Sequence, residues 1–278
     1  MLKNIMRVGV PQLGLEYEFV MRGVLALSAI HLARFKPDRR DFYMSQAMEH
    51  HQIGLRLATS IIPNITEENC SAVWIFSALT LFFTLASPRK PGDFLIMGES
   101  GISDWLILLK GTNFIIQASQ EPLYRGPFGP MFLNGKRRED FREAQLSSHP
   151  QGEDPLTDLH YVISKTVTSP HHLAILTSAI DDLRKSFIVY NQGMAFETSD
   201  IFIWLFRVQD DYLELLKRHS QEALAIFAYF CVILKRLDHH WWIEGWSTHL
   251  VEKIWGILDE EHRLWVRWPI EEIGWIPN

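Results

Sequence analysis

The chain has 278 residues, of which 47% are hydrophobic and 22% are charged, an ordinary balance for a globular protein with a substantial core. Its formal net charge of −6 argues against non-specific nucleic-acid binding by the bulk of the chain. Only two cysteines occur, Cys70 and Cys231, which excludes a disulfide framework or a cysteine metal site and favours a reducing compartment.

The N-terminal third reads as consecutive helices. Apolar residues recur near a 3.6-residue period over 16–35, and Pro37 then ends the helix. A second helix is expected over 39–61 and stops before Pro63. A third is expected over 69–88.

The third predicted helix could be mistaken for a membrane span, because residues 69–88 carry no charge over about the length that a bilayer requires. Six polar side chains interrupt this apolar run: Asn69, Ser71, Ser77, Thr80, Thr84 and Ser87. No comparable second span exists in the sequence. We therefore expect no membrane span here, and a helix buried inside a soluble bundle instead. The N-terminus also lacks the apolar run of a signal peptide.

A fourth helix is expected over 100–119, after a loop at 89–98. Residues 134–155 are strongly polar and weakly patterned, which predicts a polar flexible insertion or a frayed helix. Further helices are expected after it, at 156–165, 170–191, 199–218, 221–237 and 247–260. The sequence thus predicts one all-α domain spanning 1–278, irregular and built from about eight to ten helices, with no sheet.

The one sequence that suggests catalysis is DDYLE, which places Asp210, Asp211 and Glu214 near one helical face. Three carboxylates so placed can hold Mg²⁺ and a diphosphate, as in the DDxxD/E motif of class I terpene synthases. The second metal motif of those enzymes does not follow residue 214. A solvated acidic helix face is the preferred interpretation, and a terpene-synthase-like enzyme is the alternative.

The other polar motifs are interpreted as structural: cap, surface or core roles for the histidine pairs, and a surface role for the basic cluster. The adjacent histidines at 50/51, 171/172 and 239/240 project about 100° apart on a helix and cannot converge on one metal. No metal site and no catalytic residue is therefore assigned. The basic cluster from Lys136 to Arg142 is interleaved with acids and is interpreted as a solubilising loop, with nuclear import as the alternative.

The helices carry more apolar surface than one contact stripe needs, and residues 221–237 are apolar on nearly every side. Packed core is one explanation; the other is a pocket for an apolar ligand with a few polar anchors. The favoured lining positions lie on three predicted helices: Ala29, Leu32, Trp74, Phe82, Phe83, Phe227, Phe230 and Cys231.

Seven of the ten tryptophans follow position 240. They cap the apolar helix, and Gly245 lies between Trp242 and Trp246. Because glycine permits a positive φ, this turn is a candidate hinge or lid; a plain turn between helices is the alternative.

These segments resemble, in order and spacing, the C-terminal regulatory region of fungal zinc binuclear-cluster transcription factors, in particular the sterol uptake control protein group. The matching stretches are LALSAIHLA at 25–33, NCSAVWIFSAL at 69–79, ALAIFAYFCVILKRLDHHWWIEGW in the tail and LWVRWP at 264–269. The matching single positions are Tyr43, Ala47, His51, Gln52 and Leu55, and then Trp105, Leu108, Leu109 and Gly111 of a W-x-x-L-L-(R/K)-G element. The resemblance covers most of the chain except roughly 120–165.

The resemblance implies an all-α regulatory domain that, in the sterol-responsive members, binds sterol in a hydrophobic pocket and controls nuclear entry. That family reads DNA with an N-terminal six-cysteine zinc cluster, which this chain lacks. The expected function is ligand-responsive transcription regulation without enzymatic activity, in nucleus or cytoplasm and without direct nucleic-acid binding by this chain. The expected partners are a sterol-like molecule and a regulatory protein or a second copy; a pure interaction or dimerisation module is the remaining alternative.

Overall fold

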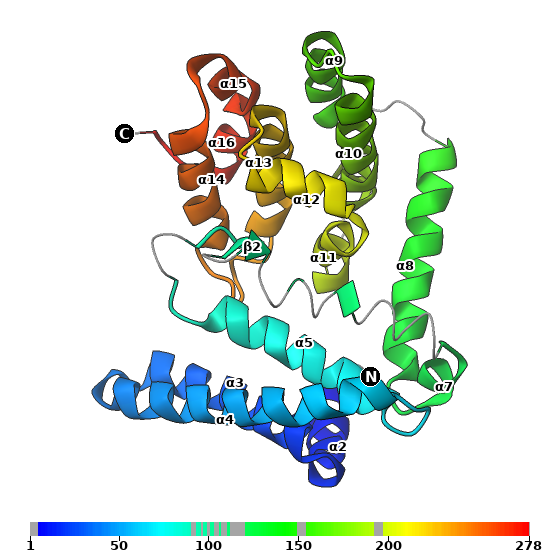
Figure 1. The fold of residues 1–278 in the computed structure, drawn as a ribbon, viewed down its shortest axis with the longest axis vertical. Helices are drawn as coiled ribbons and strands as arrows, with labels where there is room; N and C mark the ends of the chain where they lie inside the picture. Colours follow the sequence, from blue (N-terminus) through cyan, green and yellow to red (C-terminus); the bar gives the residue numbers. More distant parts are fainter. Residues whose placement is uncertain are drawn as a thin grey trace. The chain divides into compact units, whose positions relative to one another are not determined.

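The computed structural model describes residues 5–89, 93–95, 97–98, 101–102, 106, 110–111, 120–148, 154–191 and 197–277. Within these residues the chain forms fourteen α-helices, and the all-α prediction is confirmed (Figure 1). The count slightly exceeds the expected eight to ten, because the predicted helix 199–218 is divided into Thr198–Arg207 and Asp210–Lys217 and because further short helices lie outside the predicted ranges. The predicted helix 247–260 ends at Ile257, and two of these short helices follow it.

The only strands among the described residues are two of two residues each, Met97–Gly98 and Gly101–Ile102, which pair antiparallel. Most of the predicted helix 100–119, with Trp105, Leu108 and Leu109, lies outside the described residues.

The chain divides into two compact units. Unit 1 comprises Met1–Lys90 and Asp104–Arg137, and unit 2 comprises Pro91–Ser103 and Arg138–Asn278. Each unit is described by itself below, and the single domain expected from the sequence stays a prediction.

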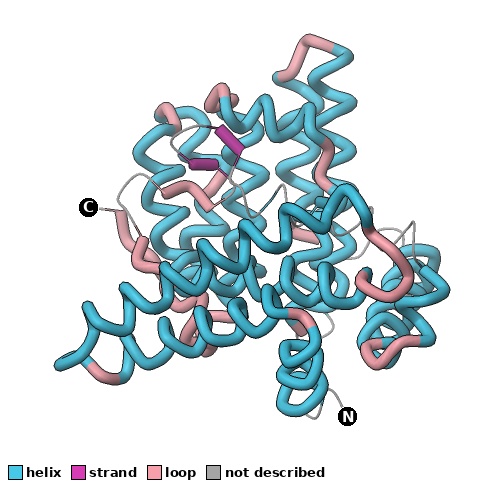
Figure 2. Tube along the Cα trace, turned by 60° about the horizontal axis from the view of Figure 1, so that its bottom comes forward, coloured by secondary structure: helices cyan, strands magenta, loops and turns pink. Residues whose placement is uncertain are grey.

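Unit 1 is built on an antiparallel helical hairpin. Helix α3 (Glu18–Phe35) is joined to α4 (Arg40–Ile61) by a 3₁₀ turn at Pro37–Arg39, where proline cannot continue the first helix (Figures 1 and 2). Helix α5 (Cys70–Ala86) packs against both helices of the hairpin, and mainly against α3. The remaining helices of the unit are α2 (Val10–Glu16), α7 (Gln120–Arg125) and the start of α8 (Gly129–Ser148).

Two glycines allow α5 to approach the hairpin closely. A Cβ at Gly54 of α4 would lie 2.9 Å from Cε2 of Phe76, and one at Gly23 of α3 would lie 3.0 Å from Cδ1 of Leu79. Both distances are shorter than a normal carbon–carbon contact. The absence of side chains at these two positions therefore sets the depth at which α5 lies against α3 and α4.

Helix α5 is the uncharged helix predicted at 69–88. Twelve of its seventeen residues are buried, as expected for a helix inside a bundle. No helix among the described residues combines the length and the apolar character needed to cross a membrane.

Unit 2 surrounds helix α13 (Gln221–Lys235). Every residue from Ala223 to Leu234 is buried, as the apolar pattern predicted. Helices from both sides in sequence pack against it: α9 (Leu156–Thr166), α10 (Pro170–Asn191), α12 (Asp210–Lys217), α14 (Trp246–Ile257), α15 (Glu260–Trp265) and α16 (Arg267–Ile273). Helix α11 (Thr198–Arg207) packs on α10.

The polar segment, expected as a flexible insertion or a frayed helix, is helical over most of its described length. Residues 134–148 form the greater part of helix α8, and residues 149–153 lie outside the described part of the chain. The physical reason is that Arg138 and Arg142 pair with Asp200 of α11 and are withdrawn from solvent. The polar face of this helix is therefore a packed face.

Candidate functional site

The residues predicted to line a ligand pocket fall into two groups. Ala29 and Leu32 lie on α3 and, with the α5 positions Trp74, Phe82 and Phe83, belong to unit 1. The other three predicted positions lie on α13 in unit 2: Phe227, Phe230 and Cys231. The structure does not test their role as ligand contacts, which stays a prediction.

In unit 1, the α5 group divides between two faces of the helix. The ring of Phe83 is buried and stacks on His51 of α4. Trp74 is half-buried and contacts Phe132 of α8, with 4.6 Å between the ring centroids. Of the two α3 positions, Ala29 is buried and Leu32 is exposed.

Two polar groups lie among these apolar helices. His51 is half-buried, and burial lowers its pKa to about 4, so the imidazole is neutral at physiological pH. Thr80 of α5 is buried, and its Oγ1 has no hydrogen-bond partner in the described structure. A buried hydroxyl without a partner costs about 1–3 kcal/mol. The two groups can donate and accept hydrogen bonds, which is the chemistry that orients an otherwise apolar ligand.

The sequence did not identify this pair. The 50/51 histidines were interpreted as surface or core residues, and Thr80 only as a polar interruption of an apolar run. The two histidines in fact have separate environments: Nδ1 of His50 is 3.1 Å from a guanidinium nitrogen of Arg22, and His51 turns onto Phe83. We define His51, Thr80 and Phe83 with the adjoining surfaces of α3, α4 and α5 as the candidate site.

In unit 2, the predicted α13 residues form an aromatic stack. Phe227 and Phe230 lie 5.7 Å apart and nearly parallel, and Trp204 of α11 stacks on both. The indole nitrogen of Trp204 donates to the backbone oxygen of Ala179, which satisfies its polar atom inside the core. Burial raises the pKa of the Cys231 thiol well above its usual range, so this cysteine behaves as a small buried hydrophobe.

The turn between α13 and α14 depends on glycine. Gly245 has φ +77°, a left-handed conformation that disfavours other residues. Its N–H donates to Oδ1 of Asp238, whose other oxygen accepts from Lys235. The flanking tryptophans are held by packing: Trp246 is buried, and Trp242 stacks on His240. The role of the Gly245 turn as a hinge or lid stays a prediction.

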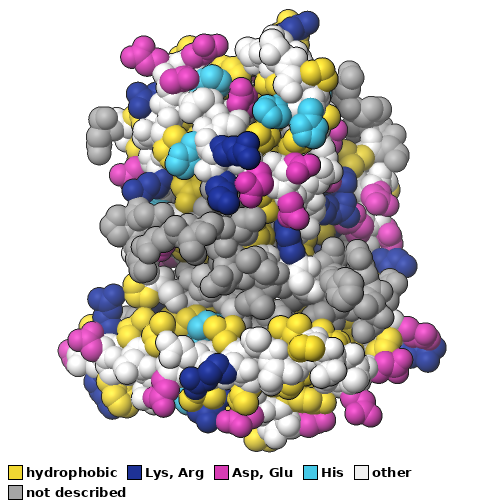
Figure 3. All heavy atoms as spheres, in the orientation of Figure 1, with side chains coloured by type: hydrophobic (Ala, Val, Ile, Leu, Met, Phe, Trp, Pro, Cys, Tyr) yellow, Lys and Arg dark blue, Asp and Glu magenta, His cyan; other side chains and the backbone are white. Residues whose placement is uncertain are grey.

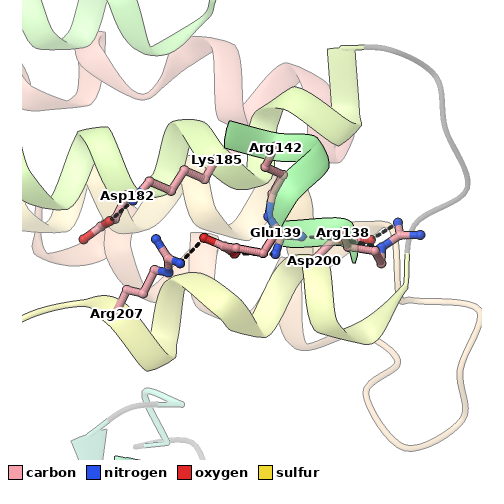
Figure 4. A network of polar contacts seen from close by, with 7 residues as sticks. All are labelled: Arg138, Glu139, Arg142, Asp182, Lys185, Asp200 and Arg207. Carbon is pink, nitrogen blue, oxygen red and sulfur yellow. Dashed lines mark hydrogen bonds and ion pairs between the residues drawn. The ribbon is translucent and has the colours of Figure 1, made fainter. Parts of the chain in front are cut away.

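A network of ion pairs joins α8 to α11 within unit 2 (Figure 4). The carboxylate of Asp200 is fully buried and accepts from Arg138 and Arg142. Burial opposes ionisation of Glu139, but Arg142 and Arg207 donate to its carboxylate, and the result is a lowered pKa. Sequence spacing could not reveal this network, because the partners are about sixty residues apart.

The carboxylates of DDYLE occupy the exposed start of α12. Asp210 and Asp211 are exposed in its first turn, and Glu214 lies 3.6 Å from Lys217 in an ion pair one turn along. No group of three or more histidines, cysteines or acids able to hold a metal occurs in the described part of the chain. The favoured interpretation of a solvated acidic helix face matches these positions.

No protein-family model matches the chain. It is 21% identical to a Zn(2)-C6 fungal-type transcription factor of Gibberella zeae, over 96% of this chain and 56% of that protein. It is 25% identical to the Zn(2)-C6 fungal-type transcription factor afumD of Aspergillus fumigatus, over 43% of this chain and 31% of that protein. It is 27% identical to Sterol uptake control protein 2 of Saccharomyces cerevisiae, over 41% of this chain and 12% of that protein.

The homologues of the chain are thus fungal Zn(2)-C6 transcription factors and a sterol uptake control protein, and the resemblance found in the sequence is confirmed. In each case the match covers only part of the relative, and at most about half of its length.

Proposed function

We propose that the chain is a ligand-responsive regulatory region of a transcription-factor-type protein, that it accommodates a sterol or a similar apolar molecule, and that it acts in the nucleus without catalysing a reaction. The observation that supports the regulatory role most strongly is the match over 96% of the chain to a Zn(2)-C6 fungal-type transcription factor. Two cysteines cannot supply the six thiolates of a binuclear zinc cluster, so the chain regulates without reading DNA itself.

The ligand is inferred from the candidate site and from one relative. That relative is called a sterol uptake control protein, and a sterol is an apolar molecule with a single hydroxyl. His51 and Thr80 provide a neutral imidazole and an unpaired buried hydroxyl among apolar helices. A ligand of about 28 heavy atoms that gains about 0.3 kcal/mol per atom would bind with roughly micromolar affinity.

The ligand proposal is tested by thermal unfolding of the purified chain with ergosterol, and by native mass spectrometry after expression in fungal cells. We expect a sterol adduct in the mass spectrum and a melting temperature that rises with sterol concentration. Absence of both the adduct and the thermal shift would refute sterol binding.

A pair of threonine variants locates the site. Thr80→Val removes the unpaired hydroxyl, whereas Thr84→Val removes a hydroxyl that bonds to the backbone oxygen of Thr80. We expect Thr80→Val to reduce the sterol-dependent shift while the ligand-free protein keeps or gains stability, since a buried orphan hydroxyl is lost. Thr84→Val should leave the sterol-dependent shift unchanged. Equal effects of the two variants would place the ligand elsewhere.

The regulatory and nuclear parts are tested separately. The chain is fused to a heterologous DNA-binding domain in a yeast reporter strain, and a fluorescent fusion is imaged in parallel. We expect the reporter output and the nuclear signal to change when sterol synthesis is inhibited. If the chain binds sterol but the reporter output stays constant, the ligand proposal is retained and the regulatory role is rejected.

An enzymatic function is the alternative, and it depends on Asp210 and its neighbours. Magnesium-dependent turnover of farnesyl diphosphate by the purified chain, lost in Asp210→Ala, would overturn the proposal. We expect no turnover.

A further inference from the structure

The end of the α3–α4 hairpin exposes aromatic residues to solvent. Every residue from Arg34 to Phe42 is exposed, and Phe35 and Phe42 expose 56% and 52% of their surfaces. Large aromatic side chains are costly to leave in water, and full burial of one is worth about 2–3 kcal/mol. Two such rings, at the end of α3 and the start of α4, give this end of the hairpin an exposed apolar character of the kind found at protein-binding surfaces.

The same end of the hairpin is basic, in contrast to the net charge of −6 of the whole chain. Arg34 to Phe42 includes four cationic and two anionic side chains, and Figure 3 shows charged and hydrophobic side chains together at this end of the hairpin. The guanidinium of Arg39 lies 4.8 Å from the ring centroid of Phe42 and 5.2 Å from that of Tyr43. In the described part of the chain, Lys36 and Arg40 have no ion-pair partner.

An apolar stripe leads along α3 to this basic end. Leu25, Leu32 and Phe35 follow one another at intervals of seven and three residues, which places them on one face of the helix, and all three are exposed. At 1.5 Å per residue the stripe is about 15 Å long. We call Leu25, Leu32 and residues 34–42 the tip surface.

We propose that the tip surface binds an acidic amphipathic helical segment of a partner protein. The apolar residues of that segment would cover Leu25, Leu32 and Phe35, and its carboxylates would face Lys36, Arg39 and Arg40. An elongated apolar stripe of about 15 Å that ends in cations is complementary to an amphipathic helix of about three turns with carboxylates at one end. Opposite charge at one end of the stripe fixes the direction of the bound helix and increases its association rate.

The arrangement fits a peptide better than an anionic membrane. A hairpin that enters a bilayer end-on would present Lys36, Asp38 and Arg39 first, and the carboxylate of Asp38 is disfavoured there. The apolar stripe runs back along the side of α3, away from the leading end. A rod-shaped partner lying along α3 covers both parts of the surface.

The experiment measures fluorescence anisotropy with a labelled 18-residue amphipathic helix that carries leucines on one face and glutamates on the other. The control peptide keeps the leucines and replaces every glutamate with lysine. We expect the acidic peptide to bind the full chain at least tenfold more tightly than the basic one. The affinity should fall as salt is raised.

Two double variants identify the surface. R39E with R40E reverses the charge of two of the four cations, and L32S with F35S removes two of the three stripe residues. Each should weaken binding of the acidic peptide at least tenfold. The exposed control substitutions R56E and L264S should change the affinity less than twofold. All positions are exposed, so the melting temperatures should be unchanged.

Three results would overturn the proposal. The first is equal affinity for the acidic and basic peptides, and the second is acidic-peptide binding that neither double variant weakens. The third is binding of a different kind of partner at the tip surface. It would be seen as binding of phosphatidylserine vesicles in place of the peptide, or as self-association in sedimentation that the double variants abolish. Because the assay contains no sterol, failure here leaves the proposed ligand function untouched.

Discussion

His51 stacks on Phe83, with 3.9 Å between the ring centroids and planes only 14° from parallel. The contact joins α4 to α5 and keeps an imidazole in an apolar environment, where the charged form is disfavoured. Burial lowers the pKa of His51 to about 4, from an ordinary value of 6.5.

This contact predicts a pH dependence of stability. Between about pH 6.5 and pH 4 the unfolded chain binds a proton at residue 51 and the folded chain does not, so stability falls as the pH is lowered through this window. His51→Phe keeps an aromatic ring on Phe83 and removes the titration. We expect the variant to lose less stability than the wild type between pH 7 and pH 4.5 in urea unfolding.

A matched control for this experiment is the exposed His171. His171→Phe should follow the wild-type pH dependence. If His51→Phe and the wild type lose equal stability on acidification, His51 is not held neutral by the fold.

The second prediction concerns Gly54, where α5 comes closest to the hairpin. Alanine is worth up to about 1 kcal/mol more than glycine in a helix, but the new Cβ would lie 2.9 Å from Phe76. Overpacking of this kind typically costs about 1–3 kcal/mol. We expect Gly54→Ala to lower the free energy of unfolding by about 1 kcal/mol.

Gly256 of α14 provides the comparison, since a Cβ there meets no atom within 4 Å. Gly256→Ala should raise the free energy of unfolding by roughly 0.5 kcal/mol through helix propensity alone. A stabilised Gly54→Ala protein would show that α5 can move away from the hairpin at no cost.

Residue periodicity predicted most helices because each has one or more apolar faces within its own segment. Helix α4 was expected over 39–61 and runs from Arg40 to Ile61, and the fully apolar α13 was expected over 221–237 and runs from Gln221 to Lys235. For the segment that contains most of helix α8, the same rule predicted only a flexible insertion or a frayed helix. The inward residues of its second half include Arg138 and Arg142, and their burial depends on a carboxylate about sixty positions away in sequence.

The candidate site was only partly predictable for a related reason. Phe83 was identified from its apolar setting, but the role of His51 depends on which of two adjacent histidines faces α5. Spacing alone does not decide that, because both positions lie near the boundary of the buried face of α4. Thr80 was visible only as a polar residue in an apolar run; the missing hydrogen-bond partner is a property of the folded chain.

The third prediction concerns the ion-pair network of α8 and α11. Asp200→Asn keeps the size of the side chain but removes the negative charge that faces Arg138 and Arg142. Breaking one partner of a buried pair typically costs about 3–5 kcal/mol, because the other charge stays buried. We expect a loss of this order in denaturant unfolding that changes little with salt. Asp211→Asn, at an exposed position, should change stability by less than about 0.5 kcal/mol.

The last prediction separates a hinge at Gly245 from a plain turn. Gly245 and Gly274 both have positive φ, +77° and +73°, so alanine at either position should cost about 1–2 kcal/mol of stability. Only Gly245 precedes the helix that follows the apolar α13, beside Trp246. If the turn is a hinge, Gly245→Ala should change the rate of amide hydrogen exchange in α14 at least threefold, and Gly274→Ala should leave that rate unchanged. Equal exchange rates in the two variants, with equal losses of stability, would identify a plain turn, because strain then acts on folding and not on local opening of the turn.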